Sequence, residues 1–181
     1  YESVNYFEPS LSVKMHGLFD QFMFGVYTDG LVLDTMTNEL FYFYYTRDRS
    51  DIVRELLRAP LAPSTVSVRF VGDKMNKEDH ERAVLKTKEK IRQRYTFQCE
   101  VGFKSEYEIV GESLHIYKRL REVNPSPYMY YVKFGAKKII GASPELLLKL
   151  TDGELETHPL AGTIVRGTSP QEDVVLARRL L

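Results

Sequence analysis

The chain has 181 residues, of which 43% are hydrophobic and 28% charged, a composition typical of a folded globular protein rather than a disordered one. Its 25 basic and 25 acidic residues cancel, so no overall charge favours a nucleic acid or a membrane surface as a partner. The single cysteine, Cys99, excludes a disulfide framework, and no apolar run approaches the ~20 residues of a membrane span, so we expect a cytoplasmic protein.

The first half of the chain predicts strands followed by one long helix. In residues 21–46, apolar or aromatic runs alternate with turn residues, which predicts strands with turns at Asp29-Gly30 and Thr37-Asn38. Residues 64–72 predict a further strand. Asn76 is a suitable N-cap for a helix of about four turns that follows it, whose thin apolar stripe indicates a surface position.

The second half predicts a strand, a helix and then a series of hairpins. Residues 95–103 alternate between apolar and polar side chains, as in a half-buried strand, and residues 111–123 have the spacing of an amphipathic helix. Four short strands follow, joined by turns at Gly135-Ala136, Ser143-Pro144 and Asp152-Gly153, which together predict an antiparallel meander. The predicted fold class is therefore α+β, with antiparallel strands and helices packed on the sheets.

Both ends of the chain have the character of interrupted elements. A helix begins well at Ser169, with Pro170 at its first position and Glu172 completing a capping box, but no stop signal follows its apolar stripe. The chain also begins with Tyr1 rather than Met. We expect residues 1–181 to be part of one larger domain, cut at both ends and without an internal boundary.

The common catalytic and binding motifs are absent from the sequence. The four histidines are scattered without metal-ligand spacing, and the sequence has no phosphate-binding glycine loop and no nucleophile elbow. The charged run from residue 73 to 94 mixes both signs, which is typical of a solvated helix face rather than a nucleic-acid site.

Three ordered motifs in the last third of the chain are more informative. They are NPSPYM at 124–129, GASPE at 141–145 and PLAGT at 159–163. In this order and spacing, together with TFQCEVGF at 96–103 and YESVNYFE at 1–8, the chain resembles the chorismate-utilising enzyme family, in its anthranilate synthase branch. The resemblance extends over the whole chain and is loosest between about residues 9 and 75.

The resemblance implies a reaction. In that branch, ammonia adds to chorismate, the C4 hydroxyl leaves with the help of Mg²⁺, and elimination of pyruvate yields anthranilate. Glu145 matches the family's acid beside the departing hydroxyl, and Gly162 and Thr163 match its chorismate-binding pair. Taken without the family, Glu145 is an ordinary strand-edge acid and Gly162 an ordinary turn glycine.

Two further residues distinguish the branches of the family. Relatives that activate water carry Lys at the Gln98 position, and a neutral Gln cannot act as that base. The aminodeoxychorismate branch carries a nucleophilic Lys at the Ala161 position, and Ala cannot form the adduct. Gln98 as a catalytic residue and Ala161 in the chorismate loop therefore favour anthranilate synthase; the aminodeoxychorismate sibling and a non-catalytic effector-binding module remain alternatives.

The resemblance also implies regulation and partners. In this branch a feedback site for tryptophan, the expected inhibitor, is lined by the NPSPYM stretch, whose members here are Asn124, Pro125, Ser126, Pro127, Tyr128 and Met129. The other half of that site, a Leu-Leu-Glu-Ser segment, is absent from this chain. A glutamine amidotransferase subunit is the expected source of ammonia.

The chain departs from the family pattern at a few positions. Arg94 replaces a usual glycine, which strains the backbone if its φ is positive, and Ile164-Val165 replace a common Arg-Pro. The family's two metal-binding glutamates, its catalytic histidine and a carboxylate-binding arginine have no counterpart before Leu181. We therefore predict no metal ligand in this chain and expect the Mg²⁺ ligands beyond Leu181.

Overall fold

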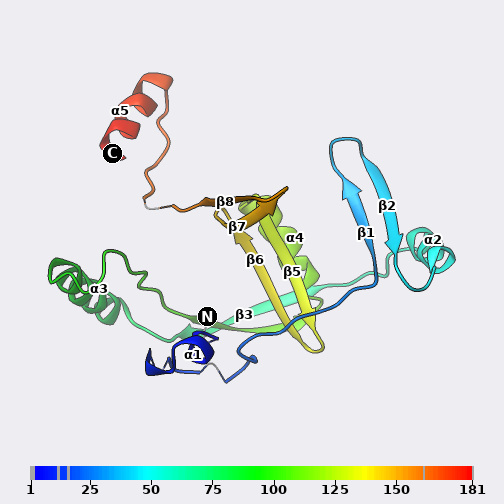
Figure 1. Ribbon diagram of the computed structural model, residues 1–181, viewed down its shortest axis with the longest axis horizontal. Helices are drawn as coiled ribbons and strands as arrows, with labels where there is room; N and C mark the ends of the chain where they lie inside the picture. The colour runs from blue at the N-terminus through cyan, green and yellow to red at the C-terminus, as the bar shows by residue number, and fades with distance from the viewer. Residues whose placement is uncertain (1–2, 12, 16, 161, 181) are drawn as a thin grey trace. The chain divides into compact units, whose positions relative to one another are not determined.

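The computed structural model describes residues 3–11, 13–15, 17–160 and 162–180. The chain divides into two units, Tyr1–Pro63 and Ser64–Leu181, and each is described separately (Figure 1). All strand pairs in the described chain are antiparallel and form two-stranded sheets, in the pairs β1-β2, β3-β4, β5-β6 and β7-β8. Together with the interspersed helices, this confirms the α+β class.

The first unit is built around one hairpin. Its elements in chain order are α1 (Val4–Phe7), the 3-10 helix η1 (Pro9–Leu11), β1 (Asp29–Asp34), β2 (Glu39–Tyr44) and α2 (Ser50–Arg58). The Asp29 carboxylate joins the hairpin to the start of α2, because it accepts hydrogen bonds from Arg49 at 2.6 Å and from the Tyr42 hydroxyl at 3.0 Å.

One predicted turn in this unit is correct and one is wrong. Asn38, with φ of 58°, lies in the predicted turn between β1 and β2. Asp29-Gly30, by contrast, is not a turn but the first part of β1, where Gly30 pairs with Phe43. A Cβ on Gly30 would lie 2.8 Å from the Phe43 ring, so this glycine permits close approach of a ring to the strand rather than a change of chain direction.

The second unit contains the remaining elements. In chain order they are β3 (Val66–Asp73), α3 (Lys77–Arg92), β4 (Ser105–Gly111), α4 (Leu114–Val123), β5 (Tyr128–Phe134), β6 (Lys137–Ser143), β7 (Leu146–Thr151), β8 (Glu154–His158) and α5 (Pro170–Leu180). The predicted N-cap of α3 is confirmed, since the Asn76 side chain accepts a hydrogen bond from the Asp79 amide at 2.7 Å.

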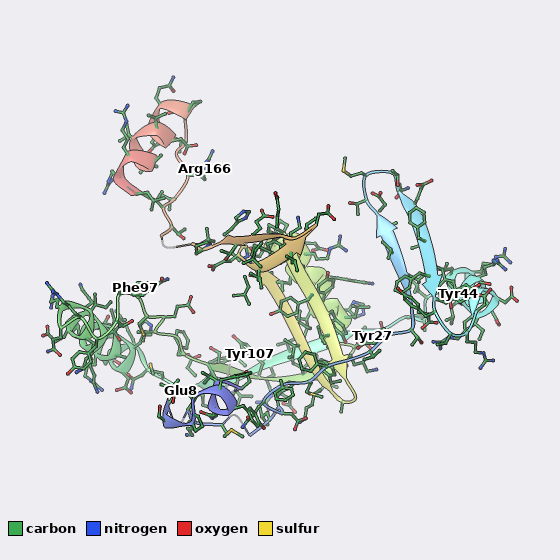
Figure 2. All side chains as sticks on the ribbon, viewed as in Figure 1. Glu8, Tyr27, Tyr44, Phe97, Tyr107 and Arg166 are labelled. Atoms are coloured by element: carbon green, nitrogen blue, oxygen red, sulfur yellow. The ribbon has the colours of Figure 1, made fainter. Side chains whose placement is uncertain are left out.

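Helix α4 packs against the β5–β6 sheet, as Figure 1 shows. The Ser113 and Tyr131 hydroxyls are 2.9 Å apart, and the Tyr117 and Tyr131 rings meet edge to face. The core is small: among the described residues, Ser113 and Leu146 are the ones that reach burial, each about 9% exposed. Large aromatic side chains stay exposed on other elements, including Tyr44, Phe97 and Tyr107, which are labelled in Figure 2.

Two predictions for the second unit need correction. Residues 95–103 form no strand, because no strand in the described part of the chain pairs with them, and an alternating pattern alone cannot supply the ladder hydrogen bonds. The four strands from Tyr128 onward form two separate hairpins rather than one meander. Pro144 offers no N–H to a ladder, and the Ser143 hydroxyl accepts the Glu145 amide at 3.3 Å, so pairing stops between β6 and β7.

Candidate functional site

Glu145 lies immediately before β7, at the same end of the hairpin at which β8 finishes. Leu146 pairs with His158, which places Glu145 beside the residues that follow β8. The Glu145 carboxylate uses Oε1 to accept a hydrogen bond from the backbone N–H of Leu160 at 3.1 Å. The hairpin therefore connects two of the three sequence motifs, although fifteen residues separate the bonded groups along the chain.

The loop beyond Leu160 forms one wall of a pocket against α5. Ala161 lies outside the described residues, so the structure does not place this predicted chorismate contact. Gly162 and Thr163 line a pocket of about 310 Å³ together with residues 164–166 and one face of α5, formed by Asp173, Leu176, Ala177 and Leu180. A Cβ on Gly162 would lie 3.2 Å from the Leu180 side chain, so this position has little room for anything larger.

The segment after this loop is fastened to the first turn of α5. Asp173 accepts a hydrogen bond from the Gly167 amide at 2.5 Å and pairs with Arg166 at 2.6 Å. A Cβ on Gly167 would lie 2.7 Å from the Asp173 backbone nitrogen, so only glycine allows this approach. Arg166, labelled in Figure 2, thus orients the chain between the pocket and the helix, a role that the sequence did not indicate.

The predicted capping box of α5 is confirmed in one of its two bonds. Ser169 accepts a hydrogen bond from the Glu172 amide at 3.2 Å, as an N-cap should. The Glu172 carboxylate, however, reaches back to Thr168, whose hydroxyl and amide both donate to it at 2.7 Å. These two hydrogen bonds favour the ionised form and lower the pKa of Glu172 below its ordinary value.

The NPSPYM stretch connects α4 to β5 and reaches the neighbourhood of Glu145 through the sheet. Asn124 is the C-cap of α4, and its amide donates to the Leu120 carbonyl at 2.8 Å. Tyr128 then pairs with Ser143, two residues before Glu145. Ser126 and Met129 are half-buried, whereas Pro125, Pro127 and Tyr128 are exposed. Their regulatory role stays a prediction.

Gln98 lies on the extended segment 95–103, which follows α3. Its side chain is exposed, and its carbonyl accepts a hydrogen bond from the Thr96 hydroxyl at 2.9 Å. Arg94, in the preceding turn, stands where the family usually has glycine. Its φ of 64° lies in the left-handed region that favours glycine. The structure thus confirms the predicted strain at Arg94, and the catalytic role of Gln98 stays a prediction.

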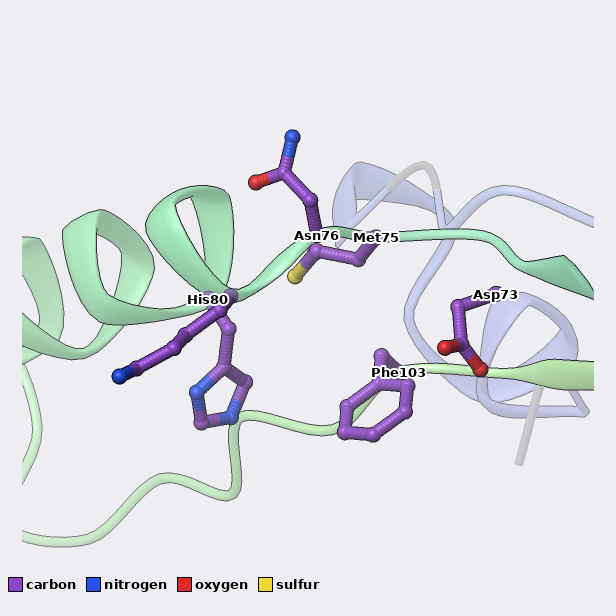
Figure 3. A pocket seen from close by; sticks show the side chains of 6 residues that line it. Asp73, Met75, Asn76, His80 and Phe103 are labelled. Carbon is purple, nitrogen blue, oxygen red and sulfur yellow. The ribbon is translucent and has the colours of Figure 1, made fainter.

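A larger pocket, of about 430 Å³, lies at the start of α3 (Figure 3). The His80 and Phe103 rings meet edge to face there, with centroids 5.9 Å apart. Its polar groups already have partners within the protein: His80 Nε2 bonds the Val101 carbonyl at 2.9 Å, Asp73 bonds the Ser105 hydroxyl, and Lys77 pairs with Glu81 at 3.7 Å. These contacts hold segment 95–103 against the start of α3, which gives the pocket a structural role.

The described residues do not fit a metal site. Among them, no three side chains of His, Cys, Asp or Glu come together in a group that could hold a metal ion. Across the same part of the chain, no helix combines the length and the apolar character that a membrane crossing demands.

Comparison with known proteins identifies the family. A model of the chorismate binding enzyme family matches residues 1–181. Anthranilate synthase component 1 of Leptospira biflexa is 42% identical over 185 residues, covering 100% of this chain and 40% of the relative. The same component of Methanothermobacter thermautotrophicus is 34% identical over 181 residues, covering 100% of this chain and 39% of the relative.

A solved structure agrees with the sequence matches. The crystal structure of anthranilate synthase component I from Streptococcus pneumoniae superposes with a TM-score of 0.64 at 26% identity, covering 84% of this chain and 36% of that one. The chain therefore spans about 40% of the length of these curated relatives. Its match to the family model from end to end shows that the chain belongs to the chorismate-binding enzyme family.

Proposed function

We propose that this chain is the chorismate-binding part of an anthranilate synthase component I, which converts chorismate and ammonia to anthranilate, pyruvate and water. One observation carries the proposal. The carboxylate of Glu145 is held by the Leu160 amide at the start of the loop that contains Gly162 and Thr163. This hydrogen bond brings an acid to the start of the loop to which we assign chorismate binding, and the departure of a hydroxyl from a bound dicarboxylate requires such an acid.

Each residue of this arrangement has a chemical role in the proposal. Glu145 protonates or hydrogen-bonds the departing C4 hydroxyl. Gly162 lets the backbone approach the substrate, while the Thr163 hydroxyl and amide are donors for a chorismate carboxylate. Gln98, which is neutral, leaves the nucleophilic attack to ammonia. Support for Gln98 comes from the family resemblance alone.

The cofactor, partner and regulator rest on the resemblance as well. Mg²⁺ is the proposed Lewis acid, which would polarise the leaving hydroxyl. The name component 1, shared by the curated relatives, supports a second subunit, for which we propose a glutamine amidotransferase. Tryptophan is the proposed inhibitor at the NPSPYM stretch, and a cytoplasmic location stays a prediction.

The proposal is tested by Glu145→Gln in the full-length protein. Gln retains the acceptor for the Leu160 amide but cannot give up a proton, so we expect turnover of chorismate with ammonia to fall by about 10²-fold or more. The matched control is Glu156→Gln, an exposed acid on the same hairpin, which should keep normal turnover.

The product decides between branches of the family. Chromatographic identification of the ortho-amino compound supports anthranilate synthase, whereas the para-amino isomer would identify the aminodeoxychorismate branch. Turnover close to normal in Glu145→Gln would remove this residue from the mechanism. Tryptophan binding without any turnover of chorismate would instead support the non-catalytic alternative.

A further inference from the structure

The β7–β8 hairpin has an irregularity directly beside Glu145. Leu146 pairs with His158, and Lys149 pairs with Glu156. Two residues of β7, Leu147 and Leu148, therefore lie opposite the single residue Thr157 of β8, which is the count of a β-bulge. Bulges are frequent next to active sites, where the extra residue changes the direction of a side chain.

The bulge determines on which face of the hairpin residue 145 lies. Side chains alternate along a strand, so a register shift of one residue moves every following side chain to the opposite face. In a hairpin without the bulge, residue 145 would share the face of Glu156, whose carboxylate lies 3.8 Å from Lys149 and 2.8 Å from His158. With the bulge, residue 145 lies on the opposite face from this charged cluster.

The side chain of Thr157 connects the two strands at the bulge. Its hydroxyl donates a hydrogen bond to the backbone carbonyl of Leu146 at 3.4 Å. Leu146 is the most buried apolar residue in the described chain, about 9% exposed, and it directly follows Glu145. A bond to Leu146 therefore restrains the backbone from which the Glu145 carboxylate reaches the Leu160 amide.

We infer that Thr157 is a positioning residue, whose hydroxyl stabilises the bulge and thereby holds the Glu145 carboxyl at the substrate loop. The inference rests on the proposed function, in which Glu145 is the acid. Thr157 itself touches no reacting atom and acts through Glu145.

The test is a pair of substitutions in the full-length protein. Thr157→Val keeps the shape and the β-branch but removes the hydroxyl, and we expect kcat to fall about 10- to 100-fold, as misplaced catalytic groups do, with KM for chorismate nearly unchanged. Thr157→Ser keeps the hydroxyl and should restore kcat. The matched control is Thr151→Val, the same change at the far end of the hairpin, where Thr151 pairs with Glu154.

A double substitution separates positioning from a general structural effect. In a Glu145→Gln background, Thr157→Val should cause no further loss of kcat, because the group that it positions is already disabled. An equal loss in both backgrounds, or normal kcat in Thr157→Val, would overturn the inference. Thr157→Ala removes the same hydroxyl and must reproduce the loss, which keeps the test decisive if the valine variant does not fold.

The two proposals fail in different ways. Normal turnover in Glu145→Gln contradicts the proposed function. Lost turnover in Glu145→Gln combined with normal turnover in Thr157→Val contradicts only the role of Thr157.

Discussion

Replacing Arg94 by glycine should stabilise the end of α3. After the helix ends at Arg92, the Arg94 amide donates to the Ile91 carbonyl at 2.9 Å and the Tyr95 amide to the Lys90 carbonyl at 3.0 Å. With Arg94 at φ of 64°, these two bonds form a Schellman motif whose left-handed residue is usually glycine. The arginine thus occupies the one position of the motif at which a side chain is unfavourable.

The expected gain follows from two opposing contributions. A side chain in the left-handed conformation costs about 1–2 kcal/mol, and glycine removes this cost. Glycine also makes the unfolded chain more flexible, and this lowers the gain by about 0.4–1 kcal/mol. The net stabilisation of the helix end is about 1 kcal/mol, equivalent to about a fivefold change in its opening equilibrium.

The assay is native-state hydrogen exchange of the amides at residues 90–95 in the full-length protein. Their exchange should slow by about fivefold in Arg94→Gly, because local opening becomes less frequent. Arg82→Gly is the matched control, because it makes the same change inside α3, where glycine is unfavourable by about 1 kcal/mol. In this variant the amides of α3 should exchange faster. Equal slowing in Arg94→Ala would refute the reasoning, since alanine removes the charge but keeps the left-handed strain.

Two further predictions concern regulation and pH. Met129 is half-buried at the end of the NPSPYM stretch, and its substitution by threonine should weaken inhibition by tryptophan while sparing turnover. The control is Met36→Thr, at an exposed methionine. Unchanged inhibition in Met129→Thr would contradict the regulatory assignment. Because hydrogen bonds from Thr168 lower the pKa of Glu172, its ionised form stabilises the start of α5 at pH values above the ordinary pKa near 4.5, and this contribution is lost as the pH falls through the lowered pKa. Hydrogen exchange of the α5 amides, measured across this acidic range, should become faster as the pH falls in the unmodified protein but not in Glu172→Gln, beyond the pH dependence common to both. Identical pH profiles of the two proteins would contradict the role of Glu172.

Local elements were predictable wherever one short pattern was sufficient. The caps at Asn76 and Ser169 hold because each depends on a bond to an amide three residues away. Helix α2 and strand β4 were missed, although Asp48 accepts the Ser50 amide at 2.8 Å directly before α2, a signal that was present in the sequence. The strand predicted at 95–103 failed because strand formation needs a partner, which alternation of side chains cannot guarantee.

The sequence by itself determined the family, the three motifs and the residue types available for chemistry. It also identified Arg94 as unusual, because a departure from glycine is visible without coordinates. Only the tertiary structure decided that Glu145 meets the Leu160 amide at the start of its loop, and that a bulge opposite Thr157 sets the face of residue 145. The physical reason is that strand register and bulges depend on pairing between distant segments, and a single-residue shift in that pairing reverses every side chain that follows.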